Sequence, residues 1–461
     1  MTRPLRIVCS VALAFAAHAV GATDLVQAWE AAQRHDAEYA AASAAFEAAG
    51  TRREQARALW RPAVMFEAAA GSMSNETSMR GAQFSAPGFG QSSGVAFDTS
   101  IRSGTLDRYS LSAKQPLINR ERLAQSRQLS LAADAGDMEW QNAQQSLMLR
   151  VAERYFDLVL ASETLRVLRQ QETSVERQLA EARDRFKLGE IPVIDTHEAG
   201  ARSESIRAQR LAAESELQLK QAAFSDVTGQ ATQGLAGLRT DAELVPRPVV
   251  PLETWLADVT TRNPQLLMHA RNLEATREEA AKQGASAAPS LDLVARMGRE
   301  SLHGNGDFGN AENRSNHRMI GVQLSIPLYT GGYRSARQEE ALHLVDKGRA
   351  DGERLRQQLA LQTRSAWLGL TVSAARISAL DQARQASLTR LDATRLGRSV
   401  GDRTMLDVLN AENEATAMEL ALLQARIAVI LDRLRLAALA GRLELDTLQS
   451  VNRLLAGTAA N

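Results

Sequence analysis

The stretch Val400–Glu414, VGDRTMLDVLNAENE, combines a glycine turn, an arginine and acids spaced three or four residues apart. A related stretch, LGEIPVIDTHEAGAR, occupies Leu188–Arg202, and aligning Gly189 with Gly401 places the two stretches 212 positions apart. A turn that recurs together with its flanking residues indicates internal duplication. The sequence therefore predicts two copies of one structural unit.

The duplication extends to the segments before each turn. ARALWRPAVMFEAAAG resembles KQGASAAPSLDLVARMG about Pro62 and Pro289, an offset of 227 positions. SAKQPLIN resembles QLSIPLYTGG about Pro116 and Pro327, an offset of 211 positions. The first copy is therefore 16 residues longer between its two prolines, where a loop is expected.

Each copy is expected to contain a helix, a β-hairpin, a long helix, a turn and a further helix. The first copy begins with a helical pattern over Ala28–Leu59. Alternating apolar residues flank two polar loops, Gly71–Gly104 and His303–His317, which predicts hairpins with arms of about ten residues, enough to cross a bilayer. Helical patterns without proline cover Glu121–Leu188 and Ser335–Val400. At 1.5 Å per residue, each of these helices reaches about 100 Å.

These elements predict the α+β class, with four membrane-crossing strands in each chain. Four strands cannot close a membrane barrel, because the smallest single-chain form has eight and an open edge in lipid leaves backbone groups unsatisfied. Chains must therefore associate. A dimer gives eight strands and a trimer twelve, and the strand count alone leaves both open.

The N-terminus, residues 1–22, has the features of a secretory signal peptide: Arg3 and Arg6, an apolar run, and small residues before Ala22. The only cysteine, Cys9, lies inside it, so we expect no disulfide and no thiol chemistry in the mature chain. The 54 basic and 54 acidic residues give no basic footprint for nucleic acid. Beyond the signal, no apolar run is long enough for a transmembrane helix.

The repeats predict how the chain is divided. After the signal peptide, we expect a first helix-hairpin-helix repeat at 23–230 and a linker at 231–251. A second repeat at 252–442 and a C-terminal tail at 443–461 complete the division.

Two other functional classes were weighed against a membrane channel. An enzyme is not expected, since the histidines show no ligand spacing and no P-loop or nucleophile elbow occurs; no catalytic residue, cofactor or metal site is predicted. A soluble periplasmic coiled-coil scaffold would explain the long helices but not the signal peptide or the alternating segments. Fractionation with outer membranes as a heat-sensitive oligomer distinguishes the channel from the scaffold.

Taken together, the signal peptide, the duplicated unit, PLYTGG and the paired turns resemble the TolC family of outer-membrane channels. The resemblance implies a homotrimer with a twelve-stranded barrel in the outer membrane of a Gram-negative bacterium, continuous with a periplasmic α-helical barrel. It also implies a periplasmic adaptor, an inner-membrane ABC transporter or proton-driven pump, contact with outer-membrane lipid, and exported cargo. Because it lacks an acylation cysteine, the chain resembles the protein exporters of type I secretion more than the lipid-anchored multidrug efflux channels.

The second turn supplies candidate pore residues. On a helix that begins after Gly401, Asp407 and Glu414 share a face with Asn410 or Ala411. In a symmetric channel this face would form rings of acid around the pore. The resemblance implies a pore constriction at Asp407, Asn410 and Glu414, where TolC itself has a second aspartate at the position of Asn410. The asparagine halves the formal charge of that ring.

The resemblance also implies a gate latch and a docking site. Arg403 matches the arginine that ties neighbouring coils shut, and Asp195 matches its acidic partner. Arg398 stands where the family has a tyrosine, so one link of the latch is missing or replaced. The glycines of the two turns, Gly189 and Gly401, match the positions at which the adaptor docks.

Overall fold

The computed structural model describes residues 23–456 except 89, 231, 233, 240, 241, 245–249 and 308, so the expected signal peptide lies outside the described residues. The chain forms two compact units. We call Ala45–Met138 with Leu267–Arg354 the strand unit; the coil unit comprises the residues up to Ala44, Glu139–Leu266 and the residues from Leu355 onward. Each predicted repeat contributes to both units.

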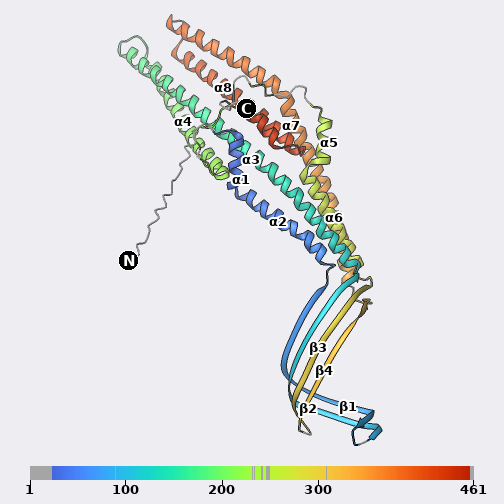
Figure 1. The fold of residues 1–461 in the computed structure, drawn as a ribbon. Helices are drawn as coiled ribbons and strands as arrows, with labels where there is room; N and C mark the ends of the chain where they lie inside the picture. The colour runs from blue at the N-terminus through green and yellow to red at the C-terminus, as the bar shows by residue number, and fades with distance from the viewer. Residues whose placement is uncertain are drawn as a thin grey trace, which may run out of the picture. The chain divides into compact units, whose positions relative to one another are not determined.

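The strand unit contains one antiparallel sheet in the order β1-β2-β3-β4, formed by Ala63–Ala86, Gly90–Ile118, Ser290–Gly306 and Gly309–Ser325 (Figure 1). The four strands confirm the predicted α+β class and strand count. The predicted arm length and both predicted loops are wrong, because the strands run for 17 to 29 residues. Glycine and serine remain in the strands because the backbone hydrogen bonds between neighbouring strands extend through these residues.

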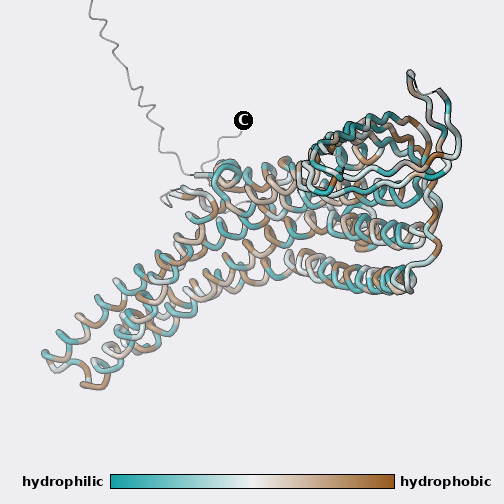
Figure 2. The backbone as a smooth tube through the Cα atoms, turned by 90° about the horizontal axis from the view of Figure 1, so that it is seen from below, coloured by the Kyte–Doolittle hydropathy of each residue, from teal (hydrophilic) through white to brown (hydrophobic). Residues whose placement is uncertain are grey.

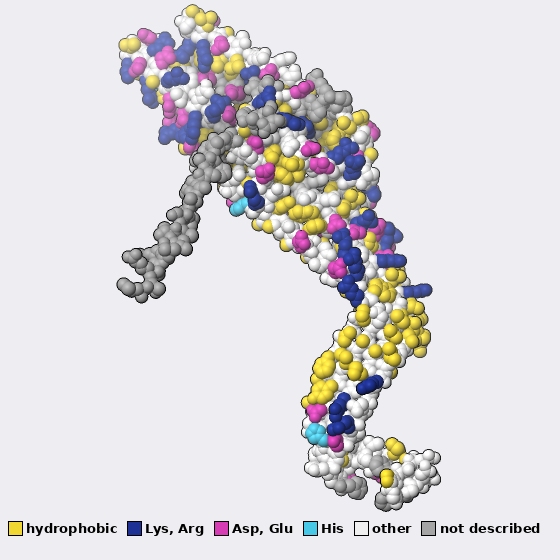
Figure 3. Space-filling view, in the orientation of Figure 1, with side chains coloured by type: hydrophobic (Ala, Val, Ile, Leu, Met, Phe, Trp, Pro, Cys, Tyr) yellow, Lys and Arg dark blue, Asp and Glu magenta, His cyan; other side chains and the backbone are white. Residues whose placement is uncertain are grey.

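One face of the sheet is apolar from Leu291 to Met297 of β3 and at the residues opposite them on β4 as far as Ile320. Ala295 lies opposite Ile320 and Leu293 lies opposite Val322, and directly opposite residues of an antiparallel pair share a face. Ile320 and Val322 keep 77% and 63% of their surface exposed. Figure 3 shows apolar side chains gathered over the strands. Such a surface is typical of a lipid-facing sheet.

The opposite face carries charged pairs between the two hairpins. Lys114 on β2 lies 2.8 Å from Asp292 on β3, and Arg108 lies 2.7 Å from Glu300. β2 belongs to the first repeat and β3 to the second, so these pairs join the repeats. The alternation of the sequence therefore separates a polar face from an apolar one.

Two long helices dominate the chain: α3, Arg120–Lys187, and α7, Tyr333–Ser399, which confirm the two predicted ones. The shorter helices α2, Ala37–Ala58, and α6, Pro264–Ala285, precede the two hairpins. Figure 2 shows hydrophilic and hydrophobic residues alternating along the helices, as expected where one side of each is buried. None of the described helices has the length and apolar character that a membrane crossing requires.

The coil unit is helical around one large apolar core. Its fully buried aromatic residues are Tyr155 and Phe156 on α3 and Phe224 on α4, Val193–Thr228. Phe156 and Phe224 both pack against the Tyr155 ring, at centroid distances of 5.4 and 6.3 Å. Besides parts of the helices above, the unit contains α1, α4, α5, α8 and α9: Leu25–His35, Val193–Thr228, Leu252–Arg262, Met405–Leu439 and Leu445–Asn452.

The helix predicted over Ala28–Leu59 is interrupted, so its continuity is wrong. Asp36 separates α1 from α2, and its carboxylate accepts a 2.7 Å hydrogen bond from the Tyr39 N–H. Asn263, 227 positions later, separates α5 from α6 and caps the second helix in the same way. Both residues are buried. A side chain that offers the backbone an alternative hydrogen bond ends one helix and starts the next.

The described residues of the predicted linker and tail contribute to the coil unit's core. Leu235 pairs with Thr23 and Leu238 pairs with Leu455 in isolated β-bridges. The Tyr155 hydroxyl donates to the Ala236 carbonyl at 2.7 Å, and burial raises the pKa of this tyrosine. Within residues 443–456, α9 packs into the core. The segment between the repeats therefore connects both ends of the described chain.

Candidate functional site

The two turns have the same backbone structure. The N–H groups of Gly189 and the next residue donate to carbonyls three and five residues back, both at 2.9 Å. Gly401 and the residue after it repeat the pattern at 3.1 and 2.8 Å. This is the Schellman end of a helix, which requires a left-handed residue. The glycines supply it with φ of 75° and 84°.

Exposed apolar side chains flank both turns. Leu188 and Val400, just before the glycines, are 74% and 75% exposed. Ile194 and Leu406, at matching positions after the turns, are also exposed. A Cβ added to either glycine would meet nothing within 4 Å. The duplicated tip thus offers open space beside apolar residues, a surface suited to packing against another helix end.

The second turn has a hydrogen-bonded cap that the first lacks. Thr404 is the N-cap of α8, and Asp407 accepts from both its N–H and its hydroxyl, each at 2.9 Å. These bonds lower the pKa of Asp407, with smaller contributions from Arg403 and Arg390. Asp407 therefore stabilises the fold above about pH 3.9 and loses this contribution as the pH falls. Pro192 begins α4 without a side-chain cap.

The buried residues of α8 determine which of its residues remain exposed. Met405 and Leu409 pack against α3 and α4, whereas Val408 and Ala411 pack toward α7. The predicted pore residues, Asp407, Asn410 and Glu414, lie between these buried positions; Asp407 is half-buried and the other two are exposed. Of the two alternatives, Asn410 and not the buried Ala411 shares this face.

Glu414 does not carry an isolated charge. It forms an ion pair with Arg390 on α7. We call α3 with α4 the first coil and α7 with α8 the second coil. Asn410 therefore stands between a carboxylate held by a helix cap and one held by an arginine. Arg390 offsets the charge of Glu414, whereas the neutral groups of Thr404 keep Asp407 ionised.

The predicted latch residues are not joined within one chain. The acid nearest to Arg403 is its neighbour Asp402, at 3.9 Å, and the described residues contain no ion pair between Arg403 and Asp195. Arg398 does form a link. Its guanidinium lies 2.8 Å from Glu181 on α3, with 16% of the arginine side chain exposed. Arg398, at which the sequence predicts that a link of the latch is missing or replaced, therefore forms an ion pair between α7 and α3.

Further polar contacts join the second coil to α3. Gln178 donates to Glu412 on α8 at 3.0 Å, and Arg166 lies 3.3 Å from Glu419. Arg395 of α7 also approaches Glu412, at 3.6 Å. Together with Arg398–Glu181, the contacts of Glu412 and Glu419 tie α7 and α8 to α3 over about four helical turns.

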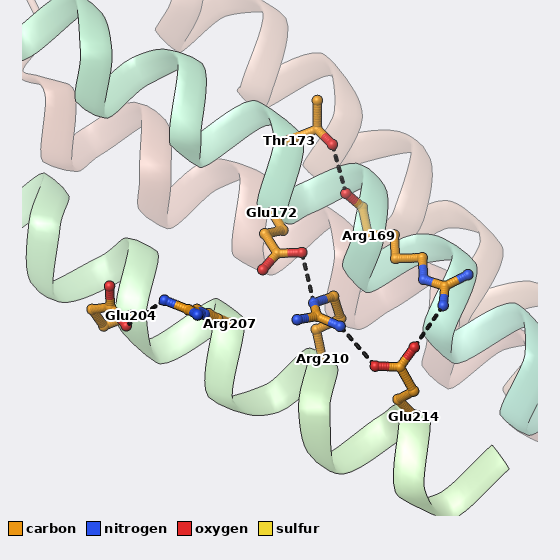
Figure 4. Close-up of polar contacts among 7 residues, drawn as sticks. All are labelled: Arg169, Glu172, Thr173, Glu204, Arg207, Arg210 and Glu214. Atoms are coloured by element: carbon orange, nitrogen blue, oxygen red, sulfur yellow. Dashed lines mark hydrogen bonds and ion pairs between the residues drawn. The ribbon is translucent and has the colours of Figure 1, made fainter. Parts of the chain in front are cut away.

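The first coil has its own charge network (Figure 4). Arg210 on α4 lies 2.8 Å from both Glu172 on α3 and Glu214, and Glu214 also binds Arg169 on α3 at 2.8 Å. The position 212 residues beyond Arg210 is Leu422. The network therefore ties α3 to α4 by residues that the second coil does not repeat at this level.

Two contributors to the site were missed by the sequence analysis. Thr404 could have been found, because a threonine three residues before an acid at a helix start is a capping-box pattern. Glu181 could not, because its partner lies 217 residues away and nothing in the local pattern distinguishes it from other surface acids.

The sequence matches the family described as outer membrane efflux protein over residues 28–230 and 255–442. The chain belongs to this family. One turn lies in each matched segment, Gly189 in the first and Gly401 in the second.

Several relatives in the family are similar over most of their length. The outer membrane protein TolC of Vibrio cholerae is 29% identical over 324 residues, covering 69% of this chain and 73% of the relative. The proteases secretion protein PrtF of Dickeya chrysanthemi is 28% identical over 417 residues, covering 88% and 86%. The solved structure of VceC from Vibrio cholerae has a TM-score of 0.73 at 20% identity, covering 91% and 97%.

Membership gives the general role. The protein is an outer-membrane efflux channel of Gram-negative type with a periplasmic extension, and channels of this family are transport proteins, not enzymes. The family implies a trimeric channel that works with an adaptor and an inner-membrane transporter. The predicted localisation and non-enzymatic class are confirmed.

Proposed function

We propose that this channel is the outer-membrane exit duct of a type I protein secretion system. The observation that carries the proposal is the alignment with the proteases secretion protein PrtF, which extends over 88% of this chain. The alkaline protease secretion protein AprF of Pseudomonas aeruginosa is also 28% identical, over 316 residues. In this role the duct passes protein from an ABC transporter and its adaptor to the outside.

Multidrug efflux is the second candidate. The outer membrane efflux protein BepC of Brucella suis is 25% identical over 307 residues, which favours this alternative less than PrtF, at 28% identity over 88% of this chain, favours secretion. Both functions use the same trimeric duct. They differ in the transporter that delivers the cargo.

The duct function gives each candidate residue a role in the proposal. The repeats at 23–230 and 252–442 supply one coil each to the periplasmic wall. The tips at Gly189 and Gly401 receive the adaptor, since both are open and apolar. Arg398 holds the two coils together through Glu181, and Arg403 of one protomer reaches Asp195 of the next when the duct is closed.

A transplant experiment tests the proposed cargo class. The channel is expressed in a strain that lacks its own TolC-type channel, with either a protease-secreting ABC transporter and adaptor or a proton-driven drug pump and adaptor. We expect protease in the medium in the first strain and little gain in drug resistance in the second. Drug resistance without protein export would instead assign the channel to efflux.

The pore face predicts how a single substitution changes ion selectivity. Asn410→Asp places a second carboxylate one turn from Asp407, so three symmetric copies add three charges to the proposed ring. We expect several-fold stronger cation preference and block by trivalent cations at several-fold lower concentration, measured in planar bilayers. In the parent channel, cation preference should persist until the pH falls below about 3.9, because the cap lowers the pKa of Asp407.

Asn413→Asp is the matched control for this prediction. It makes the same chemical change on the same helix, but Asn413 contacts Gln171 of α3, at 3.5 Å. We expect little change in block. Equal effects of both substitutions would show that the response depends on total charge and not on a ring at residue 410.

A further inference from the structure

Two arginines and a tyrosine lie at one margin of the sheet's apolar face. Arg299 on β3 lies opposite Tyr109 on β2, and Arg318 on β4 lies opposite Met297 on β3. Residues two apart on a strand, and residues directly opposite on neighbouring strands, share a face. Arg299, Arg318 and Tyr109 therefore lie on the face that carries Met297. We call these three residues the basic rim.

The two arginines are not held by any acid in the described part of the chain. Neither forms an ion pair, and both are exposed. Of the acids on this face nearby, Asp107 lies 3.9 Å from the imidazole of His303, and Glu312 is paired with the arginine two residues further on. Diagonal neighbours lie about 7–8 Å apart, so the guanidinium groups repel each other unless an anion lies between them.

The basic rim borders the apolar surface on the side of the hairpin tips. From Met297 toward the helices, this face carries Ala295, Leu293 and Leu291 of β3. In the other direction, toward the hairpin tip, Arg299 is the next β3 residue on this face. Figure 3 shows basic side chains beyond the apolar ones on the strands. The helices join the strands at the other end, and the family's extension lies in the periplasm. The basic rim therefore lies at the outer leaflet.

We propose that the basic rim binds a phosphate group of an outer-leaflet lipid. A guanidinium fork matches phosphate oxygens in pairs, and two forks at this spacing can bind one phosphate from both sides. The aliphatic stems of the arginines lie along the apolar surface while the charged ends reach the headgroup level. Tyr109 suits the same depth, because its ring is apolar and its hydroxyl is polar. The ligand is a phosphorylated lipid, with its acyl chains on the apolar face.

The proposal rests on the outer-membrane location and not on the cargo class, so failure of the secretion test leaves it unaffected. The chain offers a matched control. Arg296 lies on the same strand, is exposed and has no ion pair in the described residues, but it faces the opposite side of the sheet beside the charged pairs. Removing its charge changes the same strand without changing the lipid-facing surface.

The test is lipid retention by the purified trimer, measured by native mass spectrometry. The probes are lipid A with two phosphates and the same lipid with both removed. We expect the parent to retain phosphorylated lipid A, and the double variant R299Q/R318Q to retain at least fivefold less. R296Q should retain as much as the parent. R299K/R318K should be intermediate, since lysine keeps the charge but loses the fork.

Three results would overturn the proposal. They are equal retention by R299Q/R318Q and the parent, equal retention of the dephosphorylated lipid, and displacement of lipid A by millimolar inorganic phosphate, which would indicate a free-anion site. A heat-sensitive trimer band on electrophoresis verifies that each variant is assembled. If the double variant fails to assemble, the single variants R299Q and R318Q are compared, each with an expected loss of at least twofold.

Discussion

Replacing Gly401 or Gly189 by asparagine is expected to reduce export at least tenfold while the trimer still assembles. Asparagine tolerates the left-handed conformation that other residues adopt at a cost of about 1–2 kcal/mol. In the chain, the new Cβ would meet nothing within 4 Å, so folding loses little. The new side chain instead projects from the apolar tip, where the adaptor must approach. Secreted protein in the medium and trimer in outer membranes are the two measurements.

Gly234→Asn is the control for the turn substitutions. Gly234 also has positive φ, 74°, and open space around an added Cβ, but it lies outside both turns. We expect normal export from this variant. If export and trimer yield fall in parallel in the turn variants, the glycines act only as helix caps and the adaptor docks elsewhere.

Reversing the charge of Arg398 is expected to open the periplasmic end of the channel. The Arg398–Glu181 pair joins the two coils in each chain. Because the Glu181 side chain is 51% exposed, each copy of the pair stabilises the closed channel by about 1 kcal/mol. Three copies shift the ratio of open to closed channels on the order of 100-fold. Arg398→Glu replaces this attraction by repulsion. We expect several-fold higher single-channel conductance and sensitivity of cells to large antibiotics.

A charge swap distinguishes the pair from a general loss of stability. Glu181→Arg combined with Arg398→Glu restores the attraction in reverse, and conductance should return toward the parent value. Arg403→Ser and Asp195→Ala test the second part of the proposed latch, between protomers, and each should also raise conductance. Failure of the swap to lower conductance would mean that Arg398 acts through some other contact.

The duplicated turns show how much of the site could be predicted from sequence. The glycine conformation and the shared face of Asp407 and Asn410 follow from local patterns, because a Schellman turn and a helical period involve residues close in sequence. The hydrogen bonds of Asp407 to Thr404 also follow a local pattern, but they escaped notice because the acid was assigned only to the pore. The partner of Arg398 could not be predicted in this way, since Glu181 and Arg398 meet only through tertiary packing.

The strands and helix breaks show the same division for the fold. Hairpin positions follow from alternating residues, but strand length does not, because the glycine- and serine-rich stretch after Gly71 has weak strand propensity by itself. Its pairing with the adjacent strand decides the outcome. The break at Asp36 depends on one buried carboxylate that binds the backbone, and a helical period continues across it without a visible change.

The meeting of both ends of the described chain in one core has a consequence for biogenesis. The Leu25 N–H donates to the Asn452 side chain at 2.9 Å, and the buried Leu448 and Val451 belong to the same cluster as Leu25. A chain translocated from its N-terminus cannot complete this cluster until nearly all of it has crossed the inner membrane. Contacts between such distant residues form slowly and leave apolar surface exposed meanwhile. We therefore expect newly translocated chains to depend on periplasmic chaperones until Leu448 and Val451 have arrived.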